Sequence, residues 1–115
     1  MSATWPGKPI RQRPQAAADI AAIADYLSAK AGPAVALRFV DAIEAAYALL
    51  SAHPASGSPR HAHVLPELPV PLRFHPIKQF ERVLVHYLDQ PDAVEVIRIW
   101  DASRGLDALL EEELR

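Results

Sequence analysis

The stretch Val94-Glu-Val-Ile-Arg-Ile-Trp100 is the strongest β-prone run in the chain, because β-branched and aromatic residues favour strands. The polar turn Asp89-Gln-Pro-Asp92 joins it to a second such run, Arg82-Val-Leu-Val-His-Tyr-Leu88. Both runs carry apolar residues on both faces, so they predict a β-hairpin at the centre of a sheet, covered at least partly on each side. Strict alternation would place four residues of the second strand on one face: Val94, Val96, Arg98 and Trp100.

The segments before this hairpin predict two helices. An alanine-rich stretch over 15–30, with Pro14 in its first turn, has strong helix propensity. Gly32-Pro33 ends it, and 34–52 forms a second helix with a broad apolar stripe. Helices joined by so few residues form an antiparallel helical hairpin.

The remaining segments complete an α+β fold in a single domain, 1–115. Residues 1–9 are expected to be a frayed lead-in, and 10–13 an edge strand. The Pro- and Ser-rich segment 52–71 predicts a long loop, and 72–75 a short strand. A short C-terminal helix is expected over 104–114. The predicted architecture is an N-terminal strand, the helical hairpin packed on a small antiparallel β-sheet, and that C-terminal helix.

Composition excludes several classes of protein. The net charge of −2 is not that of a general nucleic-acid binder, so no direct nucleic-acid binding is expected. The chain has no cysteine, which excludes disulfides and thiolate chemistry and fits a reducing cytosol. No run of apolar residues suggests a secretory signal or a membrane span. A cytoplasmic protein with no membrane partner is therefore expected.

Two sets of histidines are candidates for chemistry. His61 and His63 have a spacing that could share a metal, but no third ligand follows, so a solvated loop is preferred and neither metal nor cofactor is expected. A metal-free ribonuclease would need a histidine base and arginines around the phosphate. Histidines and arginines are present, but no spacing in the sequence places them around one pocket. No catalytic residue is therefore assigned. The alternative catalytic set is His75, His86, Arg73, Arg82 and Arg98.

Trp100 ends the last predicted strand, and Arg104 lies in the polar turn that follows it. A tryptophan in this position is most simply a partly buried cap on the core. Tryptophan and arginine are also the residue types that most often anchor interfaces. The helical stripes are core residues first, although a helical hairpin on a small sheet also leaves apolar surface for a partner.

An ordered set of motifs resembles the ParE branch of the RelE/ParE superfamily of small bacterial toxins, which includes plasmid stabilisation proteins. Pro14-Gln-Ala-Ala-Ala-Asp19-Ile20-Ala-Ala-Ile23-Ala-Asp25-Tyr26 is similar to the family's first helix. Leu50-Ser-Ala-His-Pro54-Ala-Ser-Gly57-Ser-Pro-Arg60 is similar to its second helix end, and Leu72-Arg73 to the strand that follows. Val96-Ile-Arg98-Ile-Trp100 matches its last strand. Asp101-Ala-Ser-Arg104-Gly-Leu106 keeps only the arginine and leucine of its ending.

The resemblance implies the toxin of a type II toxin–antitoxin pair. A ParE-like toxin acts by binding DNA gyrase and is neutralised by a ParD-like antitoxin encoded next to it. The implied contacts with the target are Trp100, Arg104, Leu106 and Leu109. The implied contacts with the antitoxin are Ile20, Ile23, Leu27, Phe39, Arg73 and Arg98.

Two alternatives stay open. RelE-like members cut mRNA on the ribosome and are usually basic, whereas this chain is slightly acidic. The departures at Asp101, Ala102 and Gly105 also allow a degenerate toxin that keeps only antitoxin binding.

Overall fold

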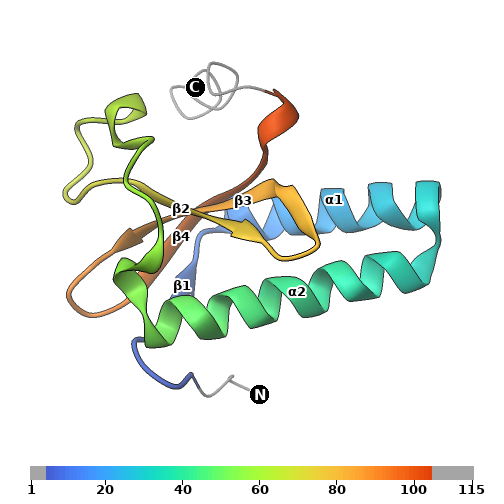
Figure 1. Cartoon of the computed structure of the whole chain (residues 1–115), viewed down its shortest axis with the longest axis horizontal. Coiled ribbons are helices and arrows are strands. Elements are labelled where there is room, and N and C mark those ends of the chain that lie inside the picture. Colours follow the sequence, from blue (N-terminus) through green and yellow to red (C-terminus); the bar gives the residue numbers. More distant parts are fainter. Residues whose placement is uncertain (1–4, 105–115) are drawn as a thin grey trace.

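The computed structural model describes residues 5–104, which form two α-helices packed on a four-stranded sheet (Figure 1). The elements are β1 (Ile10–Gln12), α1 (Pro14–Ala31), α2 (Pro33–Ala52), β2 (Arg73–Ile77), β3 (Phe80–Asp89) and β4 (Val94–Asp101), with 3-10 turns at Pro54–Ser56, Ala62–Val64 and Ala102–Arg104. The predicted α+β class is confirmed. The C-terminal helix expected over 104–114 falls, beyond Arg104, outside the described residues. Within residues 5–104, no helix is long and apolar enough to cross a membrane.

The strand order is β1-β4-β3-β2, so the predicted hairpin of β3 and β4 is central. β2, β3 and β4 are antiparallel, but β1 joins β4 in parallel. The expected sheet was antiparallel throughout. A parallel pair needs a long connection, and here the whole helical hairpin, the loop and two strands separate β1 from β4.

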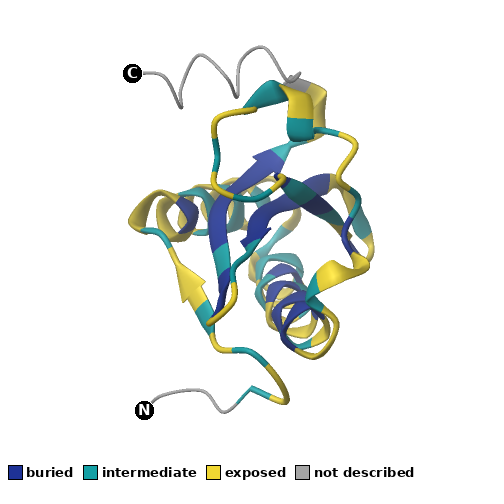
Figure 2. Cartoon of the chain, turned by 90° about the vertical axis from the view of Figure 1, so that its left-hand side faces the viewer, coloured by how far each residue is buried: buried dark blue, intermediate teal, exposed yellow. Residues whose placement is uncertain are grey.

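The helical hairpin lies on one face of the sheet (Figure 1). Gly32 lies between the helices with φ 97°, a backbone conformation that glycine adopts at little cost, and Pro33 opens α2. Figure 2 shows that buried residues concentrate on the central strands and on the side of α2 that faces them. The helix-side core consists of Ala16, Phe39, Ile43, Ala46, Tyr47, Leu50, Ile77, Val83, Val85, Tyr87, Val94, Val96 and Ile99.

A β-bulge in β4 overturns the predicted strict alternation. His86 pairs with Arg98, but the next residue, Tyr87, pairs with Val96, so Ile97 is an extra residue in β4. Such an insertion shifts the side-chain alternation by one position. Val94 and Val96 therefore share the helix side with Ile99. Arg98 and Trp100 lie opposite His86 and Leu84 on the other face.

The long loop 53–72 covers that other face. Its residues Leu65, Leu68 and Val70 pack on a loop-side core made of Leu72, Leu88 and Ile97. The loop also pairs with the outer edge of β2 through the backbones of Ser58 and Phe74, at N···O distances of 2.9 and 3.0 Å. Arg73 and Tyr87 bind its backbone from the helix side. Arg73 donates to the carbonyls of Ala55 and Gly57, and the Tyr87 hydroxyl donates to that of Pro54 and accepts from the Gly57 N–H.

Position 57 has room only for glycine when the loop is attached in this way. A Cβ at this position would collide with the hydroxyl and ring of Tyr87. We expect Gly57→Ala to lower the free energy of unfolding by about 1–3 kcal/mol, the usual cost of overpacking, and to speed hydrogen exchange in the loop. Ala55→Ser, at an exposed neighbouring position, is the control and should change stability by less than about 0.5 kcal/mol. Equal stability of the two variants, measured by urea unfolding, would contradict this role.

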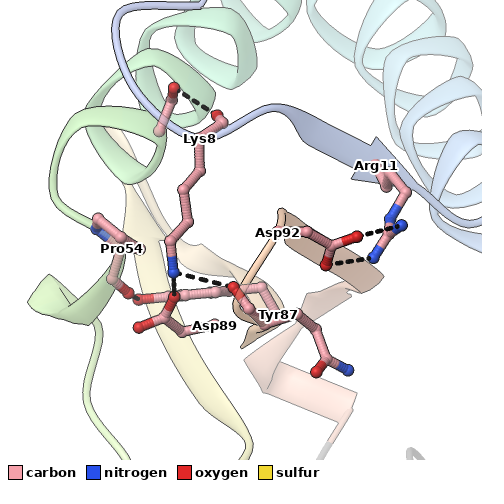
Figure 3. Close-up of polar contacts among 8 residues, drawn as sticks. Lys8, Arg11, Pro54, Tyr87, Asp89 and Asp92 are labelled. Atoms are coloured by element: carbon pink, nitrogen blue, oxygen red, sulfur yellow. Dashed lines mark hydrogen bonds and ion pairs between the residues drawn. The ribbon is translucent and has the colours of Figure 1, made fainter.

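From Trp5 onward, the segment before β1 contacts α2 and the turn between β3 and β4. The Trp5 ring packs edge-on against Tyr47 with 6.1 Å between centroids, and the Gly7 N–H donates to Ser51 Oγ. Lys8 Nζ donates to Asp89 Oδ1 at 2.5 Å and to the Gln90 carbonyl at 2.8 Å. Figure 3 shows Lys8 reaching Asp89. These contacts attach the chain start to the turn between β3 and β4.

Two further ion pairs continue along β1. Arg11 makes a two-pronged contact with Asp92 at 3.2 Å (Figure 3), and Arg13 Nε lies 2.8 Å from Glu95 Oε2. The Arg13 hydrogen bond is the main reason that the pKa of Glu95 lies below its usual value. The N-terminal ion-pair ladder, Lys8–Asp89, Arg11–Asp92 and Arg13–Glu95, thus fixes the edge strand in register.

Candidate functional site

The most completely buried ion pair among the described residues joins α1 to β4. Arg98 Nε and Nη2 donate to the Asp19 carboxylate at 2.7 and 2.9 Å, and the side chains are 3% and 11% exposed. Asp19 also accepts the Ile99 backbone N–H at 3.0 Å. β1 pairs only with residues 94–96 of β4, so Asp19 serves as the acceptor at the edge that β1 leaves uncovered. This carboxylate therefore pairs with the buried Arg98 guanidinium and also accepts a hydrogen bond from the open edge of β4.

Trp100 lies next to this ion pair and is 1% exposed. The Arg98 guanidinium lies over its ring, 4.8 Å from the centroid, which is a cation–π contact. A hollow lies between α1 and this end of β4. It is lined by Ile23, Tyr26, Ile99 and Trp100, among others. Trp100 is therefore more deeply buried than the partly exposed cap expected from the sequence.

Three rings form a cluster on the loop side of the sheet. His61 stacks on Phe74 with 4.1 Å between centroids, and His61 Nδ1 lies 3.4 Å from His86 Nε2. His86 is fully buried, and its Nδ1 has no hydrogen-bond partner. Burial, with smaller contributions from His61 and Arg98, lowers the pKa of His86 to about 4. Both rings are therefore neutral at neutral pH, because burial also lowers the pKa of His61.

The alternative catalytic set is divided between the two faces of the sheet. Arg73 and His75 lie on the helix side, where Arg73 holds the loop backbone and burial lowers the pKa of His75. His86 and Arg98 lie on the loop side and are buried, and Arg82 is exposed at the start of β3. Within residues 5–104, these five side chains do not converge on one pocket.

The residues expected to contact the antitoxin also fall into two groups. Ile20, Ile23 and Leu27 are half-buried along α1 and pack against the helix-side core. Arg73 is half-buried, whereas Phe39 is fully buried and Arg98 nearly so. Four of the six are thus accessible at the surface, and the other two support it from beneath. Of the expected target contacts, Trp100 is buried, Arg104 ends the last 3-10 turn, and Leu106 and Leu109 lie outside the described residues.

The expected absence of a metal site concerned His61 and His63. They do not face one another: His61 packs on Phe74, and the exposed His63 lies with Nδ1 3.2 Å from the Arg60 carbonyl. In the part of the chain that the structure describes, no group of three or more His, Cys, Asp or Glu could hold a metal ion.

The described residues thus form a small α+β domain of two helices on a four-stranded sheet with β1 at one edge. The model of the ParE toxin of the type II toxin–antitoxin system parDE matches residues 10–106. The chain belongs to this ParE toxin family. A solved structure described as a chromosomal ParDE toxin–antitoxin system from P. aeruginosa is similar in fold, with a TM-score of 0.64 and 23% identity, over 80% of this chain and 92% of that one. No curated protein matches the sequence.

Sequence reasoning assigned no role to Asp19. A signal was available: Arg98 interrupts an apolar strand, and a buried arginine requires a carboxylate partner. The ring cluster was missed because His61 and His86 are far apart in the sequence and only the folded loop brings them together. The hydroxyl contact of Tyr87 with Pro54 (Figure 3) was likewise not predictable from local pattern.

Proposed function

We propose that this protein is a toxin that inhibits DNA gyrase by binding it, and that a ParD-like antitoxin encoded next to it neutralises it in the cytoplasm. Membership of the ParE family gives the class, a type II toxin. The binding mechanism is supported by one observation: the histidines and arginines that an RNA-cutting site would need are divided between opposite faces of the sheet. A general base must be within reach of the proton that it removes. His86, which is fully buried, does not meet that requirement.

The proposed target contact begins where β4 ends. Arg104, Leu106 and Leu109 are the residues assigned to gyrase. Trp100, the fourth residue assigned to gyrase, is buried against Arg98 at the end of β4. The assignment rests on residue type and on position in the chain, because arginine is a common anchor of interfaces.

The proposed antitoxin contact uses the surface of the helical hairpin. Ile20, Ile23 and Leu27 present half-buried apolar groups along α1, and Arg73 lies near the end of α2. Phe39 and Arg98 act indirectly by holding α2 and α1 on the sheet.

The test compares two variants in a supercoiling assay with purified gyrase. Arg104→Ala should raise the concentration needed for half-inhibition at least tenfold, since an interface anchor is worth about 1.4 kcal/mol or more. Its melting temperature should stay unchanged. His75→Ala should inhibit gyrase as well as the unmodified chain does. In cells, induction should raise a DNA-damage reporter and leave mRNA intact.

Two outcomes would select an alternative. Cleaved mRNA with gyrase unaffected, and loss of toxicity in a folded His75→Ala variant, would place the protein with the ribosome-dependent mRNA endonucleases. Absence of toxicity together with tight antitoxin binding would identify a degenerate toxin.

A further inference from the structure

A hollow lies beneath the chain start, where this segment crosses the two helices. Figure 1 shows the start of the described chain passing the C-terminal end of α2 before it enters β1. The hollow encloses about 440 Å³, a size typical of small-molecule sites. Its lining comes from the chain start, α1 and α2, and consists of Trp5, Gln12, Ile20, Val40, Ile43, Glu44 and Tyr47. We call it the Trp5 hollow.

Two aromatic side chains form part of the wall of the Trp5 hollow. The rings of Trp5 and Tyr47 have their centroids 6.1 Å apart and meet at 63°. The Tyr47 hydroxyl donates to Gln12 Oε1 at 2.6 Å, which holds its ring in place. Burial, with a smaller contribution from the Asp19 carboxylate, raises the pKa of Tyr47, so this ring is neutral. The faces of neutral aromatic rings attract cations, and those of tryptophan do so most strongly.

The charge of the Trp5 hollow favours a positively charged guest. Among the described residues that line it, Glu44 alone is charged, and within residues 5–104 it has no ion-pair partner. The nearby cations of the N-terminal ion-pair ladder are all paired with carboxylates of their own. A cation in the hollow would therefore meet a carboxylate at the rim and no competing positive charge in the lining.

The apolar part of the lining determines which kind of cation fits. Ile20, Val40 and Ile43 offer no oxygen or nitrogen atoms in their side chains. A metal ion or a primary ammonium ion would lose its hydration there without replacement, which is costly. An alkylated ammonium ion is covered by apolar groups, so its surface matches both this lining and the ring faces.

We propose that the Trp5 hollow is a binding site for a small alkylated ammonium ion. The positively charged head lies against the Trp5 and Tyr47 rings, and the exposed Glu44 carboxylate balances its charge from the rim. Alkyl groups of the ion cover the apolar part of the lining. This inference is independent of the proposed function, because it requires neither gyrase nor the antitoxin.

The test titrates the full chain with choline and, separately, with its neutral carbon analogue, in which a tert-butyl group replaces the trimethylammonium group. The chain has two tryptophans, so two indole N–H signals are expected by NMR, and Trp5→Leu identifies the signal of Trp5. Choline should shift that signal saturably, with a dissociation constant of about 1–10 mM. The neutral analogue should bind at least tenfold more weakly. The Trp100 signal should not move, because Trp100 lies on the loop side of the sheet.

Two variants of α2 separate the charge in the hollow from charge elsewhere on the helix. Glu44→Gln keeps the shape of the side chain and removes its charge, so it should weaken choline binding at least tenfold and leave binding of the neutral analogue unchanged. Asp41→Asn is the matched control, since Asp41 is exposed on the same helix and lines a different hollow. It should change the affinity for choline less than twofold. Circular dichroism checks that both variants are folded.

Three outcomes would overturn the assignment. Equal affinity for choline and its neutral analogue would show that the hollow does not select a cation. A Trp5 signal that does not move, or that moves without saturating, would show that no site is present. Equal weakening by Glu44→Gln and Asp41→Asn would show that choline responds to the general charge of α2 and not to the Trp5 hollow.

Discussion

Asp19→Ala is expected to lower the free energy of unfolding by about 3–5 kcal/mol, the usual loss when one partner of a buried ion pair is removed. The Asp19 carboxylate accepts from Nε and Nη2 of Arg98 and from the Ile99 backbone, all within 3.0 Å. The substitution removes these acceptors at a site where water has little access. A small domain has only about 5–15 kcal/mol to lose, so the variant should be largely unfolded at moderate urea concentrations.

Asp25→Ala is the matched control, because Asp25 lies on the same helix and is exposed. It should change stability by no more than about 0.5 kcal/mol. The double variant Asp19→Ala/Arg98→Met removes both charges and should be more stable than Asp19→Ala alone. If Asp19→Ala is as stable as Asp25→Ala, the buried pair does not hold α1 on β4. The same conclusion follows if the stability losses of Asp19→Ala and Arg98→Met, each measured alone, sum to the loss of the double variant.

Acidification is expected to remove about 2 kcal/mol of stability by pH 5 through His86 alone. Burial lowers the pKa of this histidine from 6.5 to about 4. The unfolded chain therefore takes up a proton at a pH where the folded chain does not, and stability falls as pH falls from 6.5 towards 4. At about 1.4 kcal/mol per pKa unit, the full loss approaches about 3.5 kcal/mol. At pH 7.5 and above, the histidine is almost entirely neutral in both states and the contribution is nearly constant.

His86→Leu should flatten this part of the profile, measured as urea unfolding at pH 7.5, 6.0 and 5.0. His63→Leu is the control, since His63 is exposed, and it should keep the full pH dependence. A His86→Leu variant that loses stability with acid as steeply as the unmodified chain would show that other groups carry the effect.

The elements of this fold could be predicted because each has a local signal. Proline and glycine marked the helix boundaries at Pro14, Gly32 and Pro33, and the β-prone runs marked the central hairpin. The bulge at Ile97 could not be predicted, because the sequence of β4 fits regular alternation equally well. It is the packing of Val94, Val96 and Ile99 against the helices that selects the bulged register.

The site was less predictable than the fold for a related reason. Its residues interact across long distances in the sequence: Asp19 with Arg98, and His61 with His86. A motif gives residue types, such as the arginine in Val96–Trp100, but does not say which face an irregular strand presents. Arg98 was consequently assigned to contacts at the surface, whereas its side chain lies buried beneath that surface.

The N-terminal ion-pair ladder also bears on when β1 can join the sheet during synthesis of the chain. Its partners are 81 or 82 residues apart in the chain. At about 5–20 residues per second, Lys8 leaves the ribosome roughly 4–16 s before Asp89 does. β1 therefore stays without its partner strand until residues 94–96 have been synthesised. A nascent chain of this design therefore presents β1 and the helical hairpin without their partner strand for the whole of that interval.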